Sequence, residues 1–247
     1  MAHRFYAPAA SQTGLLVRLP DTEGAHLHRV LRLKAGADVR VFDGQGHEFS
    51  GTVLTVDRTG VTIETLQPIV PVREPRVAIT LAQAVLTGRK FDTVVRDAVM
   101  LGVSAVCPLV TAHTDVPDAA LHGESARQRW ERIAVASAKQ SGRAVVPVIG
   151  SPISIDRHLS DAAGELNVLL VEPGADPSCS RLDALASRPP PRHATVALGP
   201  EGGWSEGELN DARTEGWTLV TLGARTLRAD AVPVAAVSLL LYIWGEL

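Results

Sequence analysis

Most of the chain alternates short apolar runs with amphipathic segments, and this alternation limits the folds open to it. From residue 76 onward the apolar runs are RVAITLAQAV, SAVCPLV, LNVLLVE, HATVALG and WTLVTLG. Between them lie segments whose apolar residues recur at helical spacing, such as GRKFDTVVRDAVMLG and SARQRWERIAVASAKQSG. Strands and helices in alternation form a mostly parallel sheet with helices on both faces. The expected class is therefore α/β.

The last segment, ADAVPVAAVSLLLYIWGEL, is apolar on nearly every side. A helix of this composition does not stay on a free surface, so we expect it in the core or in a subunit interface. Its apolar stripe is too wide to be covered by one flank of a single sheet; the stripe consists of Val232, Ala236, Leu239, Leu240 and Ile243. We therefore expect a homodimer through this helix.

The first 70 residues have a different pattern. The stretch DVRVFDGQGHEFSGTVLTVDRTGVTIETL predicts three strands, broken at Asp43–Gly46 and Asp57–Gly60. The proline-rich PIVPVREP that follows is typical of a linker. We expect a small β-rich module in residues 1–70 and the α/β domain in residues 71–247.

Bulk properties narrow the class of protein. The net charge of −3 gives no global signal for nucleic acid, so any such binding must come from local patches. Cys107 and Cys179 lie far apart without a C-x-x-C spacing, which indicates a reducing compartment. The chain has no signal-peptide pattern and no apolar run of about 18 residues. We expect a cytoplasmic protein that makes no membrane contact.

Cations gather in two places. The segment DTEGAHLHRVLRL predicts one helix with Leu27, Val30 and Leu31 on its apolar side, and cations concentrate across residues 26–40. A second concentration lies in residues 127–143. A charge run of this kind is either a nucleic-acid contact or a solvated face, and the sequence leaves both open.

Three unusual loops follow strands in the last third of the chain. They are LVEPGADP, LGPEGGWSEGEL and LGARTLRADAVP. Ligands of parallel α/β sheets bind at the carboxyl ends of strands. A cluster of glycines there permits close approach of the backbone to a ligand or to a neighbouring loop. Three such loops favour a shared site over three ordinary turns.

The middle loop also matches the G-x-S-x-G nucleophile elbow of serine hydrolases at Ser205. That triad runs serine, acid, histidine along the chain, and all eight histidines precede Ser205. The hydrolase interpretation fails on this order. Ser205 instead forms an S-x-x-E capping box with Glu208 and predicts a helix start.

Other ligand signatures are absent from the sequence. Neither G-x-x-x-x-G-K-[ST] nor G-x-G-x-x-G occurs, so nucleotide phosphates are not the obvious ligand. His26 and His28 are two apart on the expected helix and cannot converge on one metal ion. We expect no metal.

The three loops, together with QAVLTGRKFD, AVMLGVSAVCPL and AVASAKQSGRAVVP, resemble the ribosomal small-subunit (16S) RNA uridine-N3 methyltransferases of the SPOUT superfamily. The N-terminal HRFY and HLHRVLRLKAGADVRVFDGQGHEF resemble the PUA-like RNA-binding module, a β-barrel, of the same family. The resemblance spans almost the whole chain, in the family's order.

This resemblance implies a C-terminal SPOUT domain with a trefoil knot, which is a rare exception among folds. It also implies that the knot loops bind S-adenosylmethionine within a homodimer. The residues expected to bind this cofactor are Glu172, Pro173, Leu198, Gly199, Pro200, Glu201, Gly202, Gly203, Leu222, Gly223, Arg225 and Leu227.

The resemblance assigns catalysis to the third loop. Uracil N3 carries a proton and attacks poorly until that proton leaves. Arg228 is expected to stabilise the uracil anion, and Asp230 to act as a base or as an orienting group. The alternative is a structural ion pair that caps the last helix. The family usually has Glu at the position of Asp230 and Thr at that of Ala231.

The expected partner is small-subunit ribosomal RNA or the assembled small subunit. The cations expected to contact RNA are Arg4, Arg29, Arg32, Lys34, Arg89, Lys90 and Arg143. Two other functions remain open. One is a non-catalytic ribosome-assembly protein of the same fold, and the other is a SPOUT methyltransferase acting on another nucleotide.

Overall fold

The computed structural model describes residues 3–117 and 124–247, and the chain forms two compact units. Unit 1 consists of Met1–Glu74 with Val135–Val146, and unit 2 of Pro75–Ala134 with Pro147–Leu247.

Unit 1 is built on a five-stranded sheet in the order β1-β3-β4-β5-β2. The strands are β1 (His3–Tyr6), β2 (Leu16–Arg18), β3 (Asp38–Phe42), β4 (Glu48–Asp57) and β5 (Gly60–Ile69). β1 pairs parallel with β3, and the other pairs are antiparallel. The three strands predicted between residues 38 and 66 are confirmed, whereas β1 and β2 were not predicted because each is very short.

The helix expected over residues 21–33 is shorter and changes type. α1 (Asp21–Ala25) continues into η1 (His26–Val30), a π-helical turn. Leu27 is fully buried, but Val30 is 65% exposed, so the expected apolar side with Val30 is wrong. A π-turn holds more residues than an α-turn, and this shifts the phase of the side chains after Leu27.

The end of α4 (Glu124–Ser141) belongs to unit 1. The Arg4 guanidinium donates to the carbonyl oxygens of Ala138, Lys139 and Arg143 and pairs with Glu48 at 2.9 Å. Arg4 therefore satisfies carbonyl groups that the end of a helix leaves without partners. Sequence periodicity carries no signal for this long-range contact.

Unit 2 contains an eight-stranded sheet in the order β11-β13-β10-β12-β6-β7-β8, with β9 also on β7. Every pair is parallel, which confirms the expected α/β class. The strands are β6 (Ala78–Ala84), β7 (Ala105–Val110), β8 (Val148–Ile149), β9 (Ile153–Ser154), β10 (Leu166–Leu170), β11 (Ser180–Arg181), β12 (His193–Leu198) and β13 (Thr218–Thr221).

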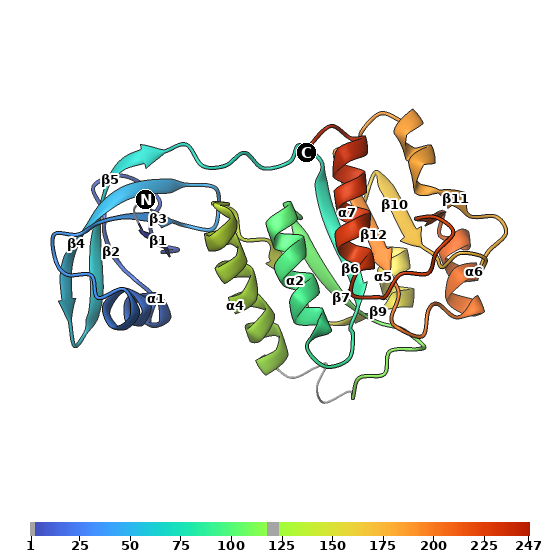
Figure 1. Ribbon diagram of the computed structural model, residues 1–247, viewed down its shortest axis with the longest axis horizontal. Helices are drawn as coiled ribbons and strands as arrows, with labels where there is room; N and C mark the ends of the chain where they lie inside the picture. Colours follow the sequence, from blue (N-terminus) through green and yellow to red (C-terminus); the bar gives the residue numbers. More distant parts are fainter. Residues whose placement is uncertain (1–2, 118–123) are drawn as a thin grey trace. The chain divides into compact units, whose positions relative to one another are not determined.

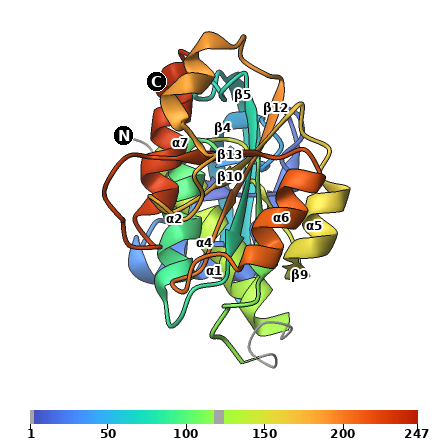
Figure 2. The same cartoon turned by 90° about the vertical axis from the view of Figure 1, so that its right-hand side faces the viewer.

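Helices cover both faces of this sheet (Figures 1 and 2). α2 (Lys90–Leu101) and α7 (Val232–Ile243) pack together on one face, and α5 (Ile155–Asp161) and α6 (Glu206–Thr214) on the other. A 3₁₀ turn, η2 (Leu182–Ser187), also contacts α7. The central strands β6 and β12 are buried almost throughout, as expected for a parallel sheet covered on both sides.

The last helix is only partly covered within this chain. Ala236, Val237 and Leu240 of α7 are fully buried, whereas Leu239 is 42% and Tyr242 is 73% exposed. Among the described residues, no helix is long and apolar enough to cross a membrane.

Candidate active site

Three neighbouring strands of unit 2 end at one edge of the sheet. β10 pairs in register with β12 on one side and with β13 on the other, and all three run in the same direction. The loops that follow Leu170, Leu198 and Thr221 are those singled out in the sequence. The parallel register brings them together, because parallel strands present their carboxyl ends at the same edge.

These loops enclose a cavity of about 380 Å³. The loops contribute nearly all of its lining, and Lys90 of α2 and Val232 of α7 complete it. The lining residues are Lys90, Leu170, Val171, Glu172, Pro173, Leu198, Gly199, Pro200, Glu201, Gly203, Trp204, Thr221, Leu222, Arg225, Thr226, Leu227, Arg228, Ala229, Asp230 and Val232.

Most of the residues expected at a cofactor site lie on this wall. Gly202 and Gly223 are the two expected residues outside it. Trp204 is among the lining residues that sequence reasoning missed. It directly follows Gly203, so extending the middle motif by one residue would have included it.

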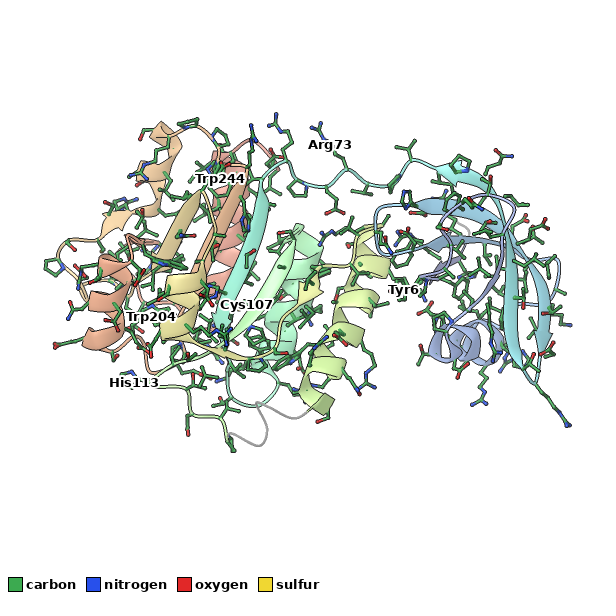
Figure 3. All side chains as sticks on the ribbon, turned by 180° about the vertical axis from the view of Figure 1, so that it is seen from behind. Tyr6, Arg73, Cys107, His113, Trp204 and Trp244 are labelled. Carbon is green, nitrogen blue, oxygen red and sulfur yellow. The ribbon has the colours of Figure 1, made fainter. Side chains whose placement is uncertain are left out.

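The glycines of the middle loop accommodate side chains of neighbouring segments. A Cβ on Gly202 would lie 2.9 Å from His113 Cβ, and one on Gly199 would lie 3.2 Å from the Trp204 ring. Gly203 has a φ of +68°, and a Cβ there would lie 3.3 Å from Glu172 Oε1. His113 and Trp204, labelled in Figure 3, therefore pack directly against the backbone of these glycines. A larger residue at Gly202 or Gly199 would push them away.

Two hydrogen bonds fix the start of the middle loop. The buried Gln83 side chain, at the end of β6, donates to the Gly199 carbonyl at 3.1 Å. Trp204 Nε1 donates to the Leu170 carbonyl at 2.7 Å and so joins the middle loop to the end of β10.

The predicted capping box at the start of α6 is confirmed. Ser205 Oγ accepts from the Glu208 amide, and Glu208 Oε2 accepts from the Ser205 amide at 2.8 Å. Glu208 Oε1 also accepts from the amide of Ala112 in the loop after β7. Ser205 therefore has a structural partner, which agrees with rejecting the hydrolase interpretation.

A charged cluster stands on the wall of the cavity. Lys90 Nζ lies 2.7 Å from Glu201 Oε1, and the Thr87 hydroxyl donates to the same oxygen at 2.8 Å. Burial acts to raise the pKa of Glu201, but the hydrogen bonds from Lys90 and Thr87 outweigh it and lower this pKa to about 2. The Glu201 carboxylate is therefore ionised at neutral pH and joins α2 to the middle loop.

Arg228 and Asp230 lie in the turn before α7 and both line the cavity. Arg228 Nε donates to Asp230 Oδ1 at 3.2 Å. The Arg228 side chain is 77% exposed and that of Asp230 is 28% exposed. The catalytic interpretation and the structural one both fit this geometry, because Arg228 and Asp230 form an ion pair and that ion pair borders the cavity.

The expected RNA contacts fall into two groups. Arg4 and Arg143 are committed within unit 1, since Arg4 binds Glu48 and Arg143 binds Glu74, and their side chains are only 12% and 5% exposed. The others reach solvent: Arg29, Arg32, Lys34 and Arg89 are exposed, and Lys90 is half-buried. Within the part of the chain that the structure describes, no cluster of metal-ligating side chains occurs.

Two family profiles match this chain. One, described as RNA methyltransferase domain, matches residues 73–241, and the other, described as RNA methyltransferase PUA domain, matches residues 19–66.

Named relatives agree with the profiles. The chain is 30% identical to the Ribosomal RNA small subunit methyltransferase E of Synechocystis sp., over 96% of this chain and 77% of the relative. It is 28% identical to the protein of the same name from Aquifex aeolicus, over 97% of this chain and 99% of the relative. A Ribosomal RNA small subunit methyltransferase E from Neisseria gonorrhoeae, solved bound to S-adenosyl methionine, superposes with a TM-score of 0.87 at 28% identity, over 99% of this chain and 98% of that chain.

Proposed function

This chain belongs to the RNA methyltransferase family, and on that premise we propose that it transfers the methyl group of S-adenosylmethionine to N3 of a uridine in small-subunit ribosomal RNA. The single observation that carries the proposal is the convergence of three loops on one cavity that Arg228 and Asp230 also line.

The cavity suits this cofactor. Its volume of about 380 Å³ falls in the range of small-molecule sites, and its wall combines apolar side chains with a few charged groups. Gly199 and Gly203 line the cavity, and a Cβ at either would press on Trp204 or Glu172, which line it too. Leu198 and Leu222 would contact the adenosine, and the Glu172 carboxylate would accept hydrogen bonds from ribose hydroxyls.

The residues of this chain then have to prepare the base. Bound S-adenosylmethionine supplies a methyl group already activated on a sulfonium. Asp230 accepts the proton from N3, and the electron pair that remains on N3 is then free to attack. Arg228 stabilises the uracil anion, whose charge spreads onto the flanking carbonyl oxygens, and the N-terminus of α7 adds to the positive field.

RNA binding in this proposal is divided between the two parts of the chain. Residues 1–70 act as an RNA-binding PUA-like domain through Arg29, Arg32 and Lys34. Residues 71–247 act as the methyltransferase domain, with Arg89 and Lys90 beside the cavity. Arg4 and Arg143 drop out of the set, because their guanidinium groups are buried against carboxylates.

We also propose that the loops after β12 and β13 form the trefoil knot and that two copies associate through α7. Leu239 and Tyr242 support the association, because exposed apolar side chains on one helix favour a partner surface. Light scattering at micromolar concentration is expected to give the mass of a dimer, and a monomer would contradict this.

A non-catalytic assembly protein is the second candidate. It is favoured by Asp230 and Ala231, which stand where the resembling family usually has Glu and Thr. The shorter carboxylate reaches less far by roughly 1.5 Å, the length of one C–C bond.

Cofactor binding and methyl transfer, measured together, separate these candidates. Titration calorimetry with S-adenosylmethionine in the presence of a chelator is expected to show saturable heat. Methyl-labelled cofactor incubated with small-subunit RNA is then expected to transfer label to the RNA. Heat without transfer to naked RNA or to assembled subunits would favour the non-catalytic candidate, and folded protein without heat would contradict the enzyme.

A further inference from the structure

Unit 1 has a cavity of its own, and neither Arg228 nor Asp230 lines it. It measures about 320 Å³ and is lined by residues of the α1–η1 segment and of the hairpin that joins β4 to β5. We call it the hairpin cavity. Its rim carries Arg18, Arg29 and Arg58, together with His28.

The floor of the hairpin cavity is apolar and closely packed. Leu19 and Val61 are each 2% exposed. Gly60 has a φ of +137°, and a Cβ there would lie 3.2 Å from Arg18 Nε. The absence of a side chain at Gly60 therefore lets the Arg18 guanidinium lie against the hairpin turn, at the edge of the cavity.

The three arginines of the rim outnumber its two carboxylates, Asp21 and Asp57. Arg18 has only a loose ion pair, 3.8 Å from Asp21, and both side chains are mostly exposed. In residues 3–117 and 124–247, no carboxylate pairs with Arg29 or Arg58. Asp57, also on the rim, accepts from the amide and hydroxyl of Thr59, and its carboxylate also interacts electrostatically with Arg18.

Three other acids of unit 1 form ion pairs with cations that do not line the hairpin cavity. Glu48 binds Arg4, Glu23 binds Lys139, and Glu74 binds Arg143. The two cations from residues 135–146 thus compensate carboxylates that would otherwise oppose the field at the rim.

The backbone beside the cavity is held in two uncommon conformations. His28 and Arg29 lie on the π-helical turn η1. Arg32, two residues after η1, has a φ of +54°, the one positive φ of a non-glycine residue in the described part of the chain. Such conformations are disfavoured, by about 1–3 kcal/mol for a left-handed residue, and they concentrate at functional sites.

We propose that the hairpin cavity binds one nucleotide of the RNA strand, with its phosphate held by Arg18, Arg29 and Arg58 and its sugar or base over the floor of Leu19 and Val61. The proposal rests on RNA being the substrate, as argued above. Arginine suits this task because its planar guanidinium donates two parallel hydrogen bonds to phosphate and also stacks on bases. Arg18 and Arg58 were not among the cations expected from the sequence.

Charge-removal variants test the assignment. We would measure binding of a fluorescein-labelled single-stranded fragment of small-subunit RNA, by anisotropy across a salt series, to wild type, Arg18→Gln, Arg58→Gln and the double variant. The matched control is Arg73→Gln, which removes an exposed cation of the same unit away from the cavity (Figure 3).

Each phosphate contact to a single strand contributes about 0.7 to the log–log salt slope. The double variant is therefore expected to lower the slope by about 1.4 and to weaken binding on the order of tenfold near 0.15 M salt. Arg73→Gln is expected to change neither value. Affinity for S-adenosylmethionine and the melting temperature should stay at wild-type values in every variant.

Other outcomes would overturn the proposal in distinguishable ways. Unchanged RNA slope and affinity in the folded double variant would reject the hairpin cavity while leaving the proposed function intact. Absence of RNA binding by wild type would reject both. Displacement of RNA by inorganic phosphate at equal phosphate concentration would show a simple anion site and reject the nucleotide assignment.

Discussion

Arg228 Nε lies 3.2 Å from Asp230 Oδ1, and both side chains border the cavity enclosed by the three loops. If Arg228 stabilises the uracil anion, Arg228→Ala should bind S-adenosylmethionine nearly as wild type does but lose on the order of 10² or more in turnover. Calorimetry and single-turnover methyl transfer measure the two quantities. A parallel loss of cofactor affinity and melting temperature, with normal turnover per folded molecule, would assign the pair a structural role.

Asp230 is tested by removing its charge while keeping its shape. Asp230→Asn is expected to lose most activity at neutral pH and to regain part of it as the pH rises, because the uracil proton then leaves without help. The pH–rate profiles of Asp230→Asn and Asp230→Glu provide the measurement, with Glu expected to retain activity. Wild-type turnover of Asp230→Asn at neutral pH would remove Asp230 from the mechanism.

Glu201 predicts a specific pH dependence of stability. Its pKa falls from 4.5 to about 2 in the folded protein, so its ion pair with Lys90 stabilises the fold fully above about pH 4.5 and is lost as the pH falls through 2. Because both side chains are about one-third exposed, the contribution is at most about 1 kcal/mol.

Urea unfolding measures this contribution. Glu201→Gln should be less stable than wild type at pH 7, and the difference should shrink below pH 4.5. Glu215→Gln, which removes an exposed carboxylate at the end of α6, serves as control and should differ little from wild type at either pH. A Glu201→Gln difference that stays constant from pH 6 down to pH 2 would contradict the account.

The first loop of the site is anchored by a buried carboxylate. Asp176 accepts from the amide and hydroxyl of Ser178, and its other oxygen pairs with Arg213 on α6. Asp176 is 3% exposed, and the loop it holds carries Glu172 and Pro173 to the cavity wall.

Asp176→Asn is therefore expected to lower stability by about 1–3 kcal/mol and to weaken binding of S-adenosylmethionine, since the loop loses charged hydrogen bonds. Chemical unfolding and calorimetry measure the two effects. The control, Arg157→Gln, breaks an exposed ion pair with Asp161 and should change stability by less than about 0.5 kcal/mol. Full cofactor affinity in Asp176→Asn would show that the loop is held by other contacts.

Much of the fold follows from patterns local in the sequence. The long strands, the helix α2 that ends at Gly102 and the Ser205 cap all carry their own signals. What local patterns do not reveal is pairing over long distances. From the sequence, Arg4 and Arg143 cannot be told from exposed arginines. In the structure each is largely buried and pairs with a distant carboxylate, Glu48 or Glu74.

The site was predictable to the level of its loops. Parallel register alone brings the ends of β10, β12 and β13 together, so the cavity follows from the strand order. The pairing of Lys90 with Glu201 was not predictable, because it joins two segments 111 residues apart through side-chain geometry. Nor does sequence spacing reveal that Gly202 serves the packing of His113.

Mass-spectrometric mapping of N3-methyluridine in small-subunit ribosomal RNA from cells that lack this protein tests the proposed reaction itself. We predict that one such modification disappears, returns with the wild-type chain and does not return with Arg228→Ala expressed at the same level. An unchanged set of N3-methyluridines in the deficient cells would contradict it.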